Sequence, residues 1–349
     1  MAFVTTGAPL LASRRASASS SLLGRPVSPP AAVTPLRRAA RQHGAAAARP
    51  RPVGPSMSAA TEPARKGRGL IQHKREAFWF YRFLSIVYDT IVNPFHWTVG
   101  MRDKSLSQAG LESPGRNLVT VDVGGGTGFN TEGVLAYVDP QYVTLLDQSP
   151  HQMAKAKAKP SLQGVTFVEG DAENLPFPTG YADRYTSAGS IEYWPEPQRG
   201  IAEAYRVLKP GGKATIIGPV RATNWFSRFW CDLWMLFPME SEYRKWYEAA
   251  GFYDVQVGYI GPEAYKGVRA HGLIMGLTIT GTKPLNGSLE PLCQLGPMEE
   301  DRDRAMTLLD RLLFLPKWII GLIAGGYYFV LPFCVMLYAA LFIRRPREA

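Results

Sequence analysis

Val121–Gly133 reads VDVGGGTGFNTEG, and this stretch decides the fold class of the 349-residue chain. It contains the pattern D-x-G-x-G-x-G, formed by Asp122, Gly124, Gly126 and Gly128, directly after a short apolar run and just before a helical pattern. Glycine at such a turn lets a ligand approach the backbone, because a Cβ atom would block it. The stretch therefore predicts a ligand site at the carboxyl end of a strand in an α/β protein.

Two classes of cofactor compete for this turn. A dinucleotide needs G-x-G-x-x-G/A, which seats its pyrophosphate on the helix N-terminus. Counted from Gly124, the third position of that pattern falls on Phe129, so the pattern fails. S-Adenosylmethionine carries no phosphate, and acidic groups suit its ammonium and hydroxyl groups, whereas Asp122 would repel a pyrophosphate. The turn therefore favours S-adenosylmethionine over nicotinamide and flavin cofactors.

Two further acids lie where the next two predicted strands end. Asp147 closes VTLLD, 19 residues after Gly128, about where a ribose-binding carboxylate belongs. Asp171, in VTFVEGDAENLPF, is expected to accept a hydrogen bond from the adenine amino group. One such acid is more often a helix cap or turn residue, but three in register with a glycine turn indicate one site. The predicted cofactor-binding residues are Asp122, Gly124, Gly126, Gly128, Asp147, Gln148, Asp171 and Ala172.

Apolar runs alternate with helical patterns around this turn, which is typical of an α/β domain with a mostly parallel sheet. The expected strands are 118–123, 142–146, 165–169, one beginning near 185, 213–217, 255–259 and 273–281. The expected helices are 131–137, 150–159, 198–208 and 241–250. Two aromatic blocks, Gly69–Gly100 and Trp225–Phe237, either pack as core or line a groove for an apolar tail.

The runs VDVGGGTG, LLDQS, EGDAENLPF and AYRVLKPGGKATIIGP resemble class I S-adenosylmethionine-dependent methyltransferases, particularly those that C-methylate quinols and sterols. The signature Arg206–Gly212 (RVLKPGG) is specific to that group, and we interpret it as the end of a helix and a reversal into the fifth strand. One departure is Tyr181–Asp183, where many relatives carry Phe-Asp, and we interpret it as local packing variation. The resemblance implies a Rossmann-like fold, with an N-terminal helical cap and S-adenosylmethionine as the cofactor.

A longer resemblance runs from about Gln72 to the C-terminus. His73–Thr98, the glycine-turn domain and one C-terminal apolar segment together are similar to plant methyltransferases of prenylated benzoquinols. This implies C-methylation of 2-methyl-6-phytyl-benzoquinol toward tocopherols and of 2-methyl-6-solanesyl-benzoquinol toward plastoquinone, in the chloroplast inner envelope membrane. The alternatives are another lipid ring (tocopherol, a demethyl naphthoquinol or a sterol) and a non-catalytic envelope scaffold. The intact acids argue against the scaffold.

Methyl transfer to an aromatic carbon needs alignment of the two reacting atoms and a group that takes a proton. Glu192, in SIEYW, lies past the fourth predicted strand, where substrate should meet cofactor, so we predict Glu192 as the base with Tyr193 beside it. The alternative for Glu192 is a loop carboxylate that faces solvent. No metal is expected, because the chemistry needs none and the three cysteines show no ligand spacing.

The net charge of +10 would suit a nucleic-acid binder if it were spread evenly. Instead, residues 1–61 hold eight of the 39 basic residues and no acid, and they are rich in Ala, Ser and Pro. That composition is typical of an organellar transit peptide. We therefore expect an organellar transit peptide at 1–61, which the resemblance implies is a chloroplast one, and no nucleic-acid partner.

The C-terminal end predicts a single-pass membrane protein. Trp318–Ile343 holds 26 residues without a charge, and a helix rising ~1.5 Å per residue would exceed a ~30 Å hydrocarbon core. The alternative is a buried core helix. The remaining expected boundaries are a cap and substrate segment at 62–115, a cofactor domain at 116–283, a linker with an amphipathic segment at 284–316, a transmembrane helix at 317–343 and a basic tail at 344–349.

Overall fold

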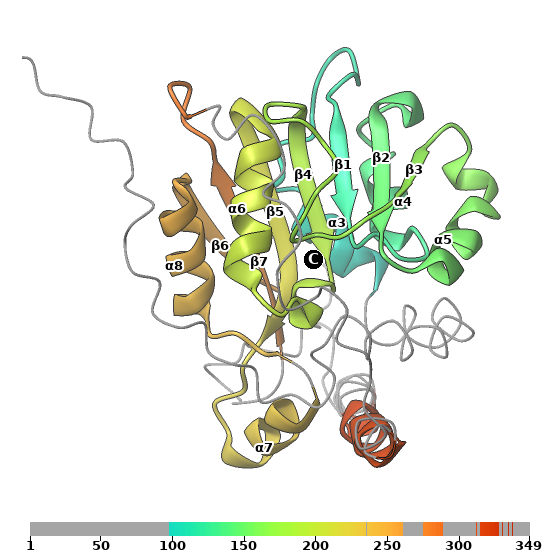
Figure 1. Ribbon diagram of the computed structural model, residues 1–349, viewed down its shortest axis with the longest axis vertical. Coiled ribbons are helices and arrows are strands. Elements are labelled where there is room, and N and C mark those ends of the chain that lie inside the picture. The colour runs from blue at the N-terminus through green and yellow to red at the C-terminus, as the bar shows by residue number, and fades with distance from the viewer. Residues whose placement is uncertain are drawn as a thin grey trace, which may run out of the picture. The chain divides into compact units, whose positions relative to one another are not determined.

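The computed structural model describes residues 98–234, 236–260, 275–288 and 315–327, together with residues 312, 330, 334 and 337 (Figure 1). The expected transit peptide at 1–61, the cap segment up to 97, the linker over 289–311 and the basic tail lie outside the described residues. Much of the expected transmembrane helix at 317–343 lies outside them too. In the part of the chain that the structure describes, no helix has the length and apolar character needed to cross a membrane.

The described strands form one sheet in the order β3-β2-β1-β4-β5-β7-β6 (Figure 1). Strands β1 to β5 pair in parallel, and β7 pairs antiparallel with both β5 and β6. Their bounds are β1 Thr120–Val123, β2 Val143–Asp147, β3 Thr166–Glu169, β4 Ala182–Ala188, β5 Leu208–Val220, β6 Tyr253–Ile260 and β7 Met275–Thr282. The chain leaves β1 toward β3 and returns to β4, so the strand order reverses between β1 and β4, where ligands of such sheets bind.

Helices cover both faces of this sheet (Figure 1). Helices α6 and α8 pack on one face and α3, α4 and α5 on the other. The helices are α3 Val99–Leu106, α4 Phe129–Val134, α5 Pro150–Lys157, α6 Pro197–Val207, α7 Trp225–Trp234 and α8 Glu240–Ala250. Short 3-10 turns are η2 Pro140–Tyr142, η3 Pro160–Leu162 and η4 Ile191–Tyr193. The expected α/β class with a mostly parallel sheet is confirmed.

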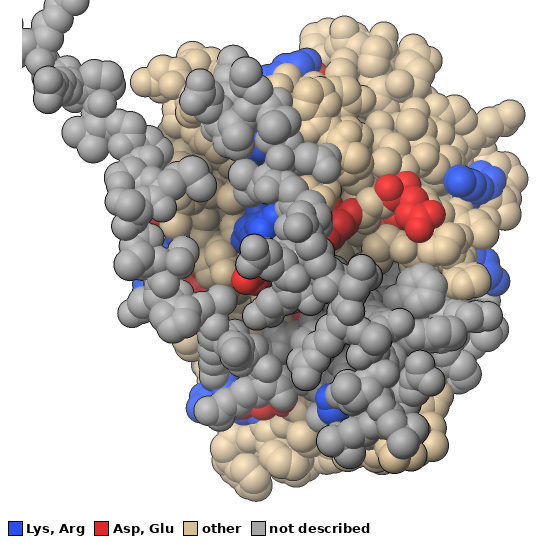
Figure 2. Space-filling model, in the orientation of Figure 1, with Lys and Arg blue, Asp and Glu red and all other residues tan. Residues whose placement is uncertain are grey.

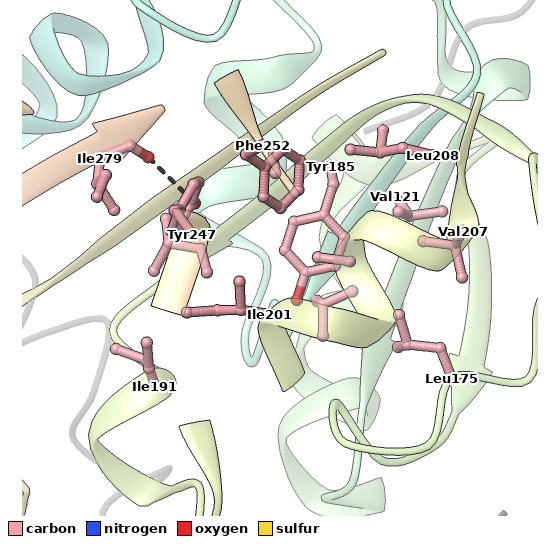
Figure 3. Packing of buried hydrophobic residues seen from close by; sticks show 14 of the residues in the cluster. Val121, Leu175, Tyr185, Ile191, Ile201, Val207, Leu208, Tyr247, Phe252 and Ile279 are labelled. Carbon is pink, nitrogen blue, oxygen red and sulfur yellow. Dashed lines mark hydrogen bonds between the residues drawn. The ribbon is translucent and has the colours of Figure 1, made fainter. Parts of the chain in front are cut away.

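The larger core lies between the sheet and the α6–α8 pair (Figure 3). Tyr247 of α8 is fully buried, its ring centre lies 4.9 Å from that of Phe252, and its hydroxyl donates to the Ile279 carbonyl oxygen at 3.3 Å. A buried tyrosine normally needs such a partner, because an unpaired hydroxyl costs desolvation energy. This hydrogen bond ties α8 to the antiparallel strand β7.

The RVLKPGG signature differs from its expected geometry. The sequence predicts a break at 209–212 before a strand at 213–217, whereas β5 already begins at Leu208. The register with β4 shifts between the Leu208 and Lys213 pairings, and this irregularity accommodates the extra residues. The Gly211 amide donates to the Lys283 carbonyl oxygen at 2.9 Å, and the Lys283 amide donates to the Gly212 carbonyl oxygen at 2.8 Å. Residues 211 and 212 are therefore held in the sheet by Lys283, the residue that follows β7.

Candidate active site

A cavity opens where β1, β2, β3 and β4 end. It is lined by the turns that follow these four strands, at residues 124–127, 146–149, 170–172 and 188–190. Of the predicted cofactor-binding residues, Gly124, Gly126, Asp147, Gln148, Asp171 and Ala172 lie in the lining. Asp122 and Gly128 do not, and their positions are described below. Residues separated by up to 70 positions in the chain, from Gly124 to Trp194, thus meet at the sheet's carboxyl edge.

The glycine turn brings its backbone close to the neighbouring strand ends. The amides of Gly124 and Gly125 both donate to the Leu146 carbonyl oxygen, at 2.7 and 3.1 Å. Gly124 has a φ of +69°, and a Cβ atom there would collide with the Ser190 side chain. Glycine at this position therefore leaves room between the turns after β1 and β4.

Asp122 lies beneath the cavity. Its carboxylate is fully buried and accepts hydrogen bonds from Asn130 (2.7 Å), Thr131 (2.6 Å) and Thr186 (3.0 Å). Burial raises the pKa of Asp122, and the three hydrogen bonds oppose that rise. These contacts join β1, α4 and β4. Asp122 therefore positions Asn130, which lines the cavity, and does not line the cavity itself.

Asp147 is held rigidly at the cavity wall. One carboxylate oxygen accepts the Gly126 amide at 2.8 Å, and the other accepts the Ser149 amide at 2.7 Å. Burial raises the pKa of Asp147 to about 6, with the two amides lowering it and the nearby Asp122 raising it further. Each oxygen keeps a free lone-pair direction. The carboxylate can therefore accept hydrogen bonds from a ligand's hydroxyl groups without moving.

The sequence prediction missed two buried amides in the lining. Gln152, in the first turn of α5, and Asn130, in α4, each keep a buried side-chain oxygen without a hydrogen-bond partner in the described residues. Such buried oxygens are costly unless a ligand or water uses them. The sequence signal for both was their position: each is a polar residue in the first turn of the helix that follows a ligand-binding turn, the glycine turn for Asn130 and the turn after Asp147 for Gln152.

Glu192 and Tyr193 lie in η4, just after β4. Tyr193 lines the cavity, whereas Glu192 is not one of its lining residues. One Glu192 carboxylate oxygen lies 3.7 Å from where a Cβ atom would stand on the lining residue Gly189. Glu192 is only 6% exposed, its second oxygen has no partner in the described residues, and burial raises its pKa to about 8. The alternative of a solvent-facing loop carboxylate is therefore wrong.

Comparison with known proteins decides the family. Residues 121–216 match a family model described as a methyltransferase domain. The chain is 60% identical over 277 residues to the chloroplastic 2-methyl-6-phytyl-1,4-hydroquinone methyltransferase of Spinacia oleracea, covering 79% of this chain and 78% of that one. The Arabidopsis thaliana protein of the same name is 57% identical over 277 residues, covering 79% and 80%. The chain belongs to this methyltransferase family.

The fold of the methyltransferase also occurs in an enzyme of another activity. The crystal structure of the [4+2]-cyclase SpnF aligns with a TM-score of 0.50 and 19% identity, covering 63% of this chain and all of that one. This likeness concerns the fold alone. The activity of the methyltransferase must therefore be argued from its site and its family.

S-Adenosylmethionine is the cofactor of this methyltransferase, and the cavity residues fit it. A fixed carboxylate at Asp147 suits ribose hydroxyls, and the unpartnered oxygens of Gln152 and Asn130 can accept hydrogen bonds from an ammonium group. No group of His, Cys, Asp and Glu that could hold a metal ion is found within the described ranges.

The charged side chains of the described residues are dispersed over the face that Figure 2 shows. On the face shown in Figure 2, the described Lys and Arg side chains lie apart from one another, with acidic side chains between some of them. Nucleic-acid binders usually gather their basic residues on one face. The described surface in this view therefore lacks that electrostatic pattern.

Proposed function

We propose that this methyltransferase transfers a methyl group from S-adenosylmethionine to a ring carbon of 2-methyl-6-phytyl-1,4-hydroquinone, and also of the solanesyl analogue that leads to plastoquinone. The observation that carries this proposal is the 60% identity to the spinach protein of that printed name, across 78% of its length. The alternative substrate is another lipid ring, whereas membership of this methyltransferase family argues against a scaffold without activity. The fixed Asp147 carboxylate and the side-chain oxygens of Asn130 and Gln152, which have no partner in the described residues, also support an enzyme over a scaffold.

The proposed roles of the cofactor residues follow from their positions. Asp147, with Gln148 beside it, binds the ribose hydroxyls, and Asp171, with Ala172, binds the adenine ring. Gly124 and Gly126 admit the methionine part to the backbone, while Gly128 starts α4 and Asp122 holds the turn from below. Each role needs only the hydrogen-bonding groups that the cavity presents.

S-Adenosylmethionine, when bound, supplies a methyl group on a sulfonium sulfur. This methyl group would pass to the quinol carbon, leaving the cofactor's sulfur as a thioether, and the ring would then lose the proton at that carbon. Holding the two atoms in line is mainly a proximity effect. Glu192 takes the proton in its ionised form, and Tyr193 helps to close the cavity against water.

The enzyme assay uses the purified full chain, labelled S-adenosylmethionine and a panel of phytyl, solanesyl and naphthyl quinols. The phytyl and solanesyl quinols should be methylated, with kcat rising as the pH passes about 8, where Glu192 ionises. Glu192→Gln should lower kcat by about 100-fold and leave cofactor affinity unchanged. Methylation of the naphthyl quinol alone would contradict the proposed substrates. An unchanged kcat in Glu192→Gln would contradict the assignment of Glu192 as the base.

We further propose that the methyltransferase lies in the chloroplast inner envelope, with residues 1–61 as transit peptide, residues 317–343 as a single-pass anchor and residues 116–283 as the cofactor domain. The relatives' printed names support the chloroplast. The anchor is supported by the uncharged Trp318–Ile343 run and by the exposed aliphatic side chains Leu315, Ile319 and Ile323, which follow each other at helical spacing.

A further inference from the structure

Helix α7 carries aromatic side chains that the fold leaves exposed. Trp225, Phe226 and Phe229 are 77%, 45% and 54% exposed, whereas Ser227 and Cys231 of the same helix are buried. The helix follows β5, whose carboxyl end lies at the same edge of the sheet as the cavity. Three large exposed rings on one helix mark a contact surface rather than ordinary scatter.

The covered side of α7 contacts the uncharged C-terminal segment. The Tyr327 hydroxyl lies 3.0 Å from the Ser227 hydroxyl, and its ring stacks on Trp230 with centres 5.7 Å apart. Phe226 meets the same ring edge-on, also at 5.7 Å. The exposed rings of α7 thus belong to the same surface as the apolar C-terminal helix.

We propose that α7 is a second contact with the lipid bilayer, formed by Trp225, Phe226 and Phe229; this rests on the proposed membrane anchor. Aromatic rings favour the boundary between headgroups and acyl chains, where the exposed Arg228 can extend to the headgroups. The contact turns the carboxyl edge of the sheet toward the bilayer. A prenylated quinol would then reach the cavity from the lipid without crossing water.

The experiment places the full chain in liposomes that contain a diazirine phosphatidylcholine, followed by irradiation and mapping of the lipid adducts. Adducts should form on Trp225–Trp234 as well as within 318–343, and the W225S/F226S/F229S variant should lose only those on α7. The matched control V99S/Y253S/L285S, which replaces exposed apolar residues elsewhere, should keep both sets. Adducts within 318–343 alone would overturn the α7 contact and leave the anchor standing, whereas adducts in neither segment would overturn both.

A second inference rests on a separate observation, a buried ion pair in α6. Arg206 donates to both carboxylate oxygens of Glu203, at 2.7 and 2.8 Å, and both side chains are at most 2% exposed. Buried pairs of this kind are stable only where further hydrogen bonds satisfy the remaining groups. The partners of those hydrogen bonds show what the pair does.

Both members of the pair also hold the segment that follows Asp171. Arg206 donates to the carbonyl oxygens of Phe177 (2.7 Å) and Leu175 (3.0 Å), and Glu203 accepts the Leu175 amide at 2.7 Å. Asp171 at the start of this segment lines the cavity. The pair therefore holds residues 175–177, the continuation of the segment whose residues 170–172 line the cavity.

We infer that Arg206 and Glu203 are positioning residues for the Asp171 end of the cofactor site, which gives the first residue of RVLKPGG a role in cofactor affinity. This rests on the proposed contact between Asp171 and adenine. A lysine at 206 keeps the charge but loses the planar fork that reaches Glu203 and two carbonyl oxygens together. The segment would then move relative to the turns after β1 and β2.

The test measures the Kd of S-adenosylhomocysteine by calorimetry for Arg206→Lys and for Val207→Ala, a core substitution next to it on α6. Both variants should lower Tm, but only Arg206→Lys should weaken binding, by about tenfold. In a cycle with Asp171→Asn, the two effects should combine to less than their product. Equal Kd values for Arg206→Lys and Val207→Ala, or fully independent effects in the cycle, would overturn the inference. Wild-type affinity in Asp171→Asn alone would overturn the adenine contact instead.

Discussion

At the scale of single residues, Asp147 makes cofactor binding depend on pH. Burial holds its pKa at about 6, and only the ionised carboxylate can accept hydrogen bonds on both oxygens from ligand hydroxyls. Affinity for S-adenosylhomocysteine should therefore fall as the pH drops below about 6. Asp147→Asn should bind at least about tenfold more weakly at higher pH and lose this dependence. Calorimetry across that range checks both, and a wild-type affinity that stays constant would contradict the assignment.

The raised pKa of the buried Glu192 makes the stability of the protein depend on pH. Its folded pKa of about 8 lies above the usual value of 4.5, so between these values the folded state keeps a proton that the unfolded chain has lost. The free energy of unfolding should therefore fall as the pH rises through this window. Glu192→Gln should flatten the slope and add on the order of 2 kcal/mol near pH 8.

Denaturant unfolding at several pH values measures this effect. Glu112→Gln, which removes an exposed carboxylate, is the matched control and should keep the wild-type slope. A slope in Glu192→Gln equal to that of the wild type would show that Glu192 is ionised in the folded state.

The residue types of the site could be predicted from the sequence, but their contacts could not. The glycine turn and the strand-end acids are local patterns, so Asp147 and Asp171 were found. Asp122 belongs to the same pattern, yet its carboxylate binds Asn130, Thr131 and Thr186 instead of lining the cavity. Those partners come from α4 and β4, and which of them lie beside Asp122 depends on tertiary packing that no local pattern contains.

At the scale of elements, Gly128 connects the glycine turn to α4. It caps the helix with a φ of +89°, and an added Cβ would collide with Leu162 of η3. Gly128→Ala should therefore destabilise the protein by about 2 kcal/mol or more. Gly100→Ala, in the exposed start of α3 with no atom within 4 Å of the new methyl, should instead stabilise it by about 0.5–1 kcal/mol. Thermal unfolding separates the two, and equal Tm changes would contradict the backbone argument.

The type of an element, helix or strand, was predictable wherever local signals in the sequence marked it clearly. Pro150–Lys157 and Glu240–Ala250 agree with their expected helices, because proline at the first turn of one and Gly251 after the other mark these ends locally. The start of β5 was not predictable, since 209–212 resemble a turn and the backbone of Lys283 draws Gly211 and Gly212 into the sheet. That partner lies about 70 residues away, beyond any local pattern.

At the scale of the whole molecule, the placement of the catalytic edge follows from two surfaces. The cavity lies at the carboxyl ends of β1 to β4, and β5 leads from that edge into α7, which contacts Tyr327 of the C-terminal helix. The proposed prenyl tail of the substrate and the proposed anchor would thus both lie at the carboxyl edge of the sheet. The net charge of +10 plays no part in this, because its excess is concentrated in residues 1–61.

Deletion of Trp318–Ala349 tests the anchor. The shortened protein should appear in the soluble fraction after alkaline washing of membranes, because the 26-residue uncharged run that favours the bilayer is gone. Deletion of residues 344–349 alone, which removes only the basic tail, should leave the protein in the pellet. The α7 rings by themselves should give at most a reversible association, which alkaline washing disrupts. A shortened protein that stays in the washed pellet would show that another segment holds the chain in the membrane.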